Sequence, residues 1–135
     1  MAEPAAAFAS PNRPFNFDWE AVERGVPLST LEDFAAYSGL TLKDLLEVVI
    51  PARTLKHRRQ RQEPLSADES DRLRRVARTF DLAARIYGSA ERARQWLTNP
   101  KRRFKERAPI SLLRTQAGEH AVEEFLIQID EGIFL

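Results

Sequence analysis

The segment from Pro51 to Gln62 contains no acidic residue and carries side chains suited to binding an anion. Arg and Lys can reach guanine edges and phosphates in the major groove of DNA, and a Thr hydroxyl can donate to a phosphate. The sequence therefore predicts DNA contacts from Arg53, Thr54, Lys56, His57, Arg58 and Arg59.

The residues ahead of this segment favour DNA binding over the usual role of a charge run, a solvated helix face. Thr41 and Asp44 can form a capping box that opens a helix over Thr41–Val49. A tight link joins it to a second helix over Pro51–Arg59, with Pro51 in the first turn and Leu55 as its core anchor. The pair has the proportions of a helix-turn-helix.

The distribution of charge indicates an anionic partner for the middle of the chain. The 135 residues have a net charge of +1, with 43% hydrophobic and 30% charged residues. Residues 1–50 hold 3 basic and 8 acidic side chains, and residues 51–114 hold 18 basic and 7 acidic ones. Residues 115–135 hold 5 acidic side chains and no Lys or Arg, so the end invites a different partner or packs on the basic middle.

Two further basic groups lie beyond the DNA-binding candidate. Arg72, Arg74, Arg75 and Arg78 alternate with acids on a long helix and are expected to solvate its outer face. The loop Lys101–Arg107 has five basic residues in seven. It can contact DNA backbone, another subunit or only water, and the sequence does not rank these.

The chain ends on three large apolar residues after a helix-stopping glycine, Gly132. Chain ends are usually polar and frayed, so Ile133, Phe134 and Leu135 either fold back on the core or dock into a partner. Both alternatives stand on the residues alone.

Enzymatic chemistry has little support. There is no cysteine, no glycine-rich phosphate loop and no histidine spacing for a metal, so neither a metal site nor a cofactor is predicted. A small enzyme using His120, Glu123 and Glu124 is a remote rival, because adjacent carboxylates point to different helix sectors. No apolar run reaches membrane-spanning length and the N-terminus has no basic start, so we expect no membrane association and a cytoplasmic location.

Hydrophobic spacing predicts an all-α chain without period-2 strands. The expected helices are Asp18–Arg24, Leu31–Ser38 opened by Ser29-Thr30, Thr41–Val49, Pro51–Arg59, a long helix between Ser66 and Gly88, Ala90–Thr98, Pro109–Leu113, and a last one between Thr115 and Gly132. Ser66 and Glu69 can form a capping box that opens the long helix. The long helix has an apolar stripe at i, i+3, i+4, i+7, i+11 and i+14, made of Leu73, Val76, Ala77, Phe80, Ala84 and Tyr87. Residues 1–14 are expected to be a mobile tail, residues 15–80 a helix-turn-helix region and residues 81–135 a second helical domain.

Two sets of motifs, one in each half of the chain, together cover roughly residues 25 to 135. The C-terminal half carries Tyr87-Gly88, Ala93-x-x-Trp96-Leu97, Asn99-Pro100, Pro109-x-x-Leu112-Leu113, Thr115-x-x-Gly118, Val122 and Gly132. The N-terminal half carries Ile50-x-x-Arg53-Thr54-Leu55-x-x-Arg58-Arg59, Leu65-Ser66 and Glu69-Ser70-Asp71-Arg72-Leu73. In order and spacing these motifs resemble those of the Xre-type antitoxins. The sequence departs from that family at Lys105-Glu106-Arg107, where glycines are common, and at Glu131, where an aromatic is common.

The resemblance implies a non-enzymatic antitoxin that binds a RES-domain toxin, an enzyme that depletes NAD, and covers its active site. It also implies a dimer that binds and represses its own promoter through the Pro51–Arg59 helix. The toxin-facing residues would be Glu123, Asp130, Gly132, Ile133, Phe134 and Leu135. The rival is a stand-alone helix-turn-helix repressor whose C-terminal helices only dimerise.

Overall fold

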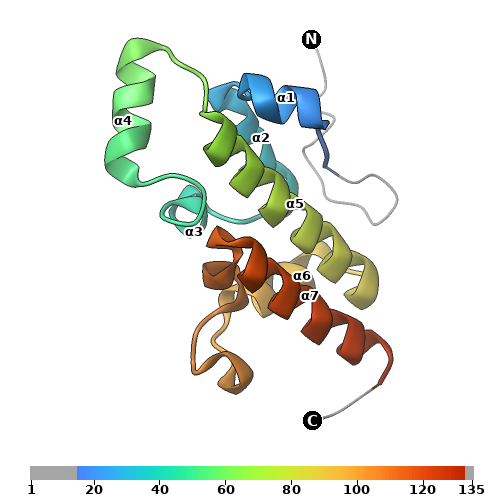
Figure 1. The fold of residues 1–135 in the computed structure, drawn as a ribbon. Coiled ribbons are helices and arrows are strands. Elements are labelled where there is room, and N and C mark those ends of the chain that lie inside the picture. Colours follow the sequence, from blue (N-terminus) through green and yellow to red (C-terminus); the bar gives the residue numbers. More distant parts are fainter. Residues whose placement is uncertain (1–14, 133–135) are drawn as a thin grey trace.

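A computed structural model describes residues 15–132, and within that range the chain is helical without a β-strand, as predicted (Figure 1). The helices are α1 Trp19–Arg24, α2 Leu28–Ser38, α3 Leu42–Leu45, α4 Ala52–Arg61, α5 Ala67–Tyr87, α6 Ala90–Thr98 and α7 Gln116–Asp130, with 3₁₀ turns η1 Arg102–Phe104 and η2 Pro109–Arg114. No helix of residues 15–132 combines the length and the apolar content needed to cross a bilayer.

Helix α5 is the central element and contacts α1, α2, α6, α7 and η2. Figure 1 shows α1 and α2 beside its first half, and α6 and α7 beside its second half. The predicted apolar stripe is confirmed by the burial of Leu73, Val76, Ala77, Phe80 and Ala84, and its last member, Tyr87, is half-buried. Because α5 runs without a break through residue 80, both halves of the chain share one hydrophobic core.

Local capping signals locate several helix starts correctly. The capping boxes Thr41–Asp44 and Ser66–Glu69 both form. In each, the hydroxyl oxygen accepts from the N–H of the acidic residue, and the carboxylate accepts from the N–H of the Thr or Ser. Thr115 accepts a hydrogen bond from the Gly118 N–H at the start of α7. Such caps satisfy N–H groups that have no partner inside the helix, and they depend on residues only three positions apart.

The predicted start of α2 and end of α3 are both wrong. Helix α2 begins at Leu28, and Thr30 N–H already bonds Pro27 O, so Ser29-Thr30 lies inside the first turn. Helix α3 ends at Leu45, and Glu47 takes a left-handed backbone with φ of 71°. The reason is burial: an irregular link places all of Val48, Val49 and Ile50 in the core, which one helix face cannot do.

The arginines of α5 bind neighbouring backbone, so the expectation that all four solvate its outer face is wrong. Nε of Arg72 donates to Val49 O and Nε of Arg74 donates to Phe17 O, each at 3.0 Å. Nη1 of Arg75 donates to Leu113 O and Arg114 O at 3.1 and 3.2 Å. These cations connect α5 to three other segments; Arg78 remains exposed.

Candidate nucleic-acid and partner interfaces

Helix α4 presents one basic face to solvent and lies at the edge of the molecule (Figure 1). Leu55 is its buried residue, 3% exposed. On the opposite side Arg53, Lys56 and His57 are exposed at positions i, i+3 and i+4. Gln60, at i+7, continues the same face, and its amide can read adenine. The sequence prediction omitted Gln60, although counting two helical turns of 3.6 residues from Arg53 reaches it.

The other predicted DNA-binding residues lie off this face. Nη2 of Arg58 pairs with Oε2 of Glu69 at 3.0 Å, and Nη2 of Arg59 pairs with Oε1 of Glu32 at 3.4 Å. Thr54 is half-buried. The structure therefore brings three of the six predicted residues together on the free face of α4, and it places Arg58 and Arg59 in ion pairs with the body of the protein.

Glu69 connects the start of α5 to α4. Its side chain is 6% exposed, accepts from Ser66 N–H at 2.7 Å through Oε1 and pairs with Arg58 through Oε2. Burial alone would raise the pKa of Glu69, but the Ser66 hydrogen bond and the Arg58 guanidinium outweigh burial and hold the pKa below its ordinary value of 4.5. The ionised carboxylate thus stabilises the position of α4 on the core.

Glu69→Gln is expected to lower the free energy of unfolding at pH 7 by about 2 kcal/mol, the cost of losing bonds to a charged group. Because the folded pKa is lowered, the contribution of Glu69 is complete above pH 4.5 and is lost as pH falls through the folded pKa. Urea unfolding at pH 7 and pH 3 checks this. The difference in free energy of unfolding between parent and variant should be large at pH 7 and small at pH 3. An equal difference at the two pH values would contradict the charge argument.

Among the predicted toxin-facing residues, Glu123 lies in the middle of α7, Asp130 is its last residue and Gly132 follows shortly after it. Glu123 is half-buried, Asp130 is exposed, and Gly132 is exposed with φ of 75°. Ile133, Phe134 and Leu135 lie outside the described residues.

Two side chains on the outer side of α7 were missed by the sequence analysis. Ile127 is 43% exposed, and Gln128 Oε1 is buried with no donor among residues 15–132. Both line a shallow groove of about 400 Å³, together with His120, Glu123, Glu124 and Glu131. An exposed large apolar side chain in a groove with a polar rim is typical of a surface that binds a partner.

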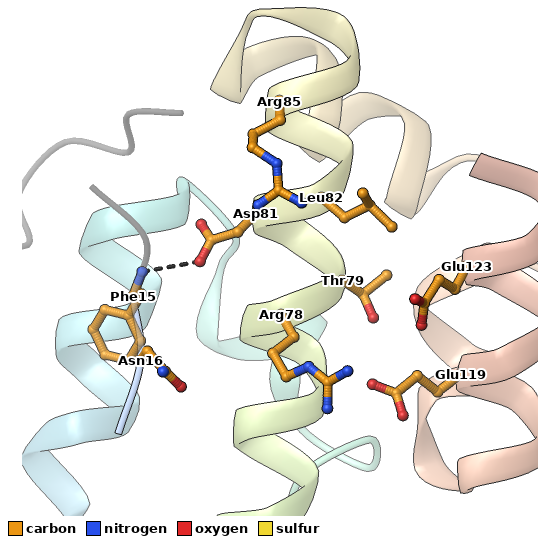
Figure 2. A pocket seen from close by; sticks show the side chains of 9 residues that line it. All are labelled: Phe15, Asn16, Arg78, Thr79, Asp81, Leu82, Arg85, Glu119 and Glu123. Atoms are coloured by element: carbon orange, nitrogen blue, oxygen red, sulfur yellow. Dashed lines mark hydrogen bonds between the residues drawn. The ribbon is translucent and has the colours of Figure 1, made fainter. Parts of the chain in front are cut away.

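A second cavity lies over the middle of α5, between the Phe15 segment and α7 (Figure 2). Its buried carboxylate, Asp81, accepts from Phe15 N–H at 2.9 Å and from the Tyr37 hydroxyl at 2.6 Å. Burial raises the pKa of Asp81 against the effect of these two bonds. Both oxygens are engaged in holding the N-terminal segment and α2 on α5, so this carboxylate has a structural role.

The basic loop Lys101–Arg107 is packed on an aromatic cluster made of Trp96, Phe104 and Phe125. Nζ of Lys101 lies 5.3 Å from the centre of a Trp96 ring, and the Arg103 guanidinium carbon lies 4.4 Å from that of Phe125. Burial lowers the pKa of Lys101. The loop is closed by a backbone hydrogen bond, in which Lys101 N–H donates to Arg107 O at 3.0 Å. Lys101 is thus half-buried against Trp96, while Arg103 covers the Phe125 ring and is exposed to solvent, as are Arg102 and Lys105.

Lys105 and Glu106 occupy left-handed backbone, with φ of 57° and 65°. This conformation costs a non-glycine residue about 1 kcal/mol or more. Lys105→Gly and Glu106→Gly are each expected to raise the free energy of unfolding by about 0.5–1 kcal/mol, measured by urea unfolding. Arg102→Gly is the control, because Arg102 lies in η1 and its replacement should destabilise. Destabilisation by all three glycines would contradict the strain argument.

Comparison with known families matches each half of the chain to a described domain. Residues 20–78 match the Antitoxin Xre-like helix-turn-helix domain, and residues 82–132 match the Antitoxin Xre/MbcA/ParS C-terminal toxin-binding domain. The two matches meet inside α5, and the first includes α4 while the second includes α7.

Three curated relatives are each named antitoxin Xre. The protein of Pseudomonas putida is 49% identical over 84 residues, which are 62% of this chain and 53% of that protein. Those of Yersinia enterocolitica and Photorhabdus laumondii are 25% and 28% identical, covering 85% and 83% of this chain and 79% and 77% of the relatives. The match thus spans about half of the Pseudomonas protein.

Proposed function

Because the chain belongs to the Xre-type antitoxin family, with a helix-turn-helix and a toxin-binding domain, we propose that it neutralises a RES-domain toxin that depletes NAD. The C-terminal end, from Gly132 to Leu135, covers the entrance to the toxin's active site. This inhibition is steric and requires no chemistry from the antitoxin, only an apolar anchor inside a polar rim. The complex forms in the cytoplasm, where NAD is consumed.

The outer side of α7 is the observation that carries the proposal. Ile127 is exposed on the helix that leads to the C-terminal end, and it lines a groove whose rim is polar. A toxin that binds the end of the chain also covers this side of α7. Burial of Ile127 then contributes binding energy next to the entrance of the active site.

Acidic side chains around this surface steer the association. Glu123, Glu124, Asp130 and Glu131 lie on or just after α7, and a pocket built for a dinucleotide is basic. Steering acts on the association rate and is weakened by salt. Replacing the four with Gln or Asn should slow association and flatten its salt dependence, and an unchanged rate and salt dependence would remove this part of the proposal.

The same protein represses the promoter of its own operon by placing the free face of α4 in the major groove. Support comes from the match to the helix-turn-helix family and from the exposed side chains of Arg53, Lys56 and His57. A homodimer presents two such helices to an operator with two half-sites.

The test measures cellular NAD while the neighbouring open reading frame of the operon is induced. NAD is expected to fall without the antitoxin and to be kept by the full chain. Deleting Ile133–Leu135 should abolish the rescue, and Ile127→Arg should weaken it. Ala36→Arg is the matched control, because it puts the same charge on an exposed position of α2 and should rescue fully.

The outcomes separate the antitoxin from a stand-alone repressor. If the truncated chain preserves NAD and Ile127→Arg does not, the inhibitory contact lies on α7 and not at the C-terminal end. If NAD never falls on induction, the toxin pairing is wrong. DNA binding that persists without any effect on NAD favours the rival, in which the C-terminal helices only dimerise.

A further inference from the structure

A groove of about 610 Å³ separates the start of α4 from the start of α7. One wall comes from the α3–α4 link and the other from η2 and the first turn of α7, which lie next to each other in Figure 1. Pro51, Glu47, Arg72, Arg107 and Arg114 are among the residues that line it. The groove thus joins the helix-turn-helix half to the toxin-binding half.

Three guanidinium groups give this groove an excess of positive charge. Arg72 donates to a carbonyl, Val49 O, and Arg107 donates to the hydroxyl and carbonyl oxygens of Ser111. The exposed Arg114 side chain makes no hydrogen bond or ion pair with any residue from 15 to 132. None of these three guanidinium groups forms an ion pair with a residue from 15 to 132, and the groove has one lining carboxylate, Glu47.

The position of the groove selects its ligand. Pro51 lies on its wall, and Arg53, on the free face of α4, follows two residues later. When a helix enters the major groove, the sugar-phosphate strand flanking that groove passes beside the start of the helix. The first turn of α7, the positive end of its helix dipole, also lines the groove, next to Arg114.

We propose that the groove between α4 and α7 binds a backbone phosphate of the operator duplex, with Arg114 as the principal ligand and Arg72 and Arg107 beside it. The inference rests on the proposed DNA-binding function and adds a contact from the toxin-binding domain. A phosphate contact acts on every sequence alike. The C-terminal domain therefore contributes affinity without sequence preference, while α4 reads the bases.

The experiment measures duplex binding by the full chain from fluorescence anisotropy at several salt concentrations. The probes are a duplex from the gene's own upstream region and a shuffled duplex of equal length. Arg114→Gln is expected to lower affinity roughly five- to tenfold near 0.1 M salt on both duplexes, and to flatten the slope of log K against log salt by about 0.9. Arg114→Lys should restore most of the affinity, because it keeps the charge.

Arg92→Gln is the matched control, since Arg92 is exposed on α6 and does not line the groove. Equal affinities and slopes for Arg114→Gln and Arg92→Gln overturn the phosphate site. If Arg53→Gln still weakens binding in that case, the DNA-binding function stands and only the groove assignment is wrong. If the parent chain binds neither duplex, both proposals are wrong.

Discussion

Replacing Gly118 with alanine is expected to lower the free energy of unfolding by about 3 kcal/mol, the upper range for overpacking a core. A Cβ at this position would lie 1.8 Å from Leu112 O and 2.7 Å from the Leu112 carbonyl carbon. Helix propensity alone predicts the opposite sign, because alanine is favoured over glycine by about 1 kcal/mol inside a helix. The overlap is with backbone and cannot be relieved by a side-chain rotation.

The backbone that Gly118 touches is held on the other side. Leu113 is fully buried, and Arg75 binds both Leu113 O and Arg114 O from α5. Moving η2 away from α7 would break these bonds, so α7 must shift instead. The close approach at Gly118 therefore fixes the direction in which α7 carries the proposed toxin-binding surface.

The urea midpoint of Gly118→Ala against the parent chain checks this prediction. Gly88→Ala is the matched control, because Gly88 has φ of 65° and no atom within 4 Å of its added Cβ. The free energy of unfolding of Gly88→Ala should fall by only about 1 kcal/mol, the cost of placing an alanine in the left-handed conformation. A Gly118 variant as stable as the control would mean that η2 yields easily and does not fix α7.

Features that depend on neighbouring residues could be predicted from the sequence, and features that depend on tertiary contacts could not. The Ser66–Glu69 capping box and the apolar stripe of α5 require only a spacing, and both are confirmed. The end of α3 depends on how many of Val48, Val49 and Ile50 the core can accept, which no local pattern reports. An extra helical turn was predicted there for this reason.

The candidate sites divide in the same way. The sequence indicates that α4 is basic, but the bonding of Arg58 to Glu69 depends on how α4 lies across the start of α5. Charge composition likewise gave no sign that Arg72, Arg74 and Arg75 bind backbone carbonyls of distant segments. Arginine is especially hard to assign from sequence, because one long side chain can serve DNA, an ion pair or a neighbouring loop.

Neutralising the free face of α4 with the double variant Arg53→Gln and Lys56→Gln is expected to lower operator affinity by about 100-fold near 0.1 M salt. Both side chains are exposed and make no ion pair within residues 15–132. Their loss therefore removes contacts to DNA without altering the fold. The slope of log K against log salt should flatten by about 1.8 if both contact phosphates. If Arg53 reads a base instead, the slope changes less and the preference for the operator over a shuffled duplex narrows.

Arg58→Gln distinguishes a surface contact from a structural one on the same helix. Because Arg58 is paired with Glu69, this variant should lower both thermal stability and DNA affinity, whereas the double variant should lower affinity alone. Circular dichroism melting beside anisotropy titration separates the two effects. If the double variant binds as tightly as the parent while Arg58→Gln does not, the DNA-contacting face of α4 is the side of Arg58 rather than that of Arg53. The Glu69 ion pair would then have to open when DNA binds, and raising the salt concentration would make that opening less costly.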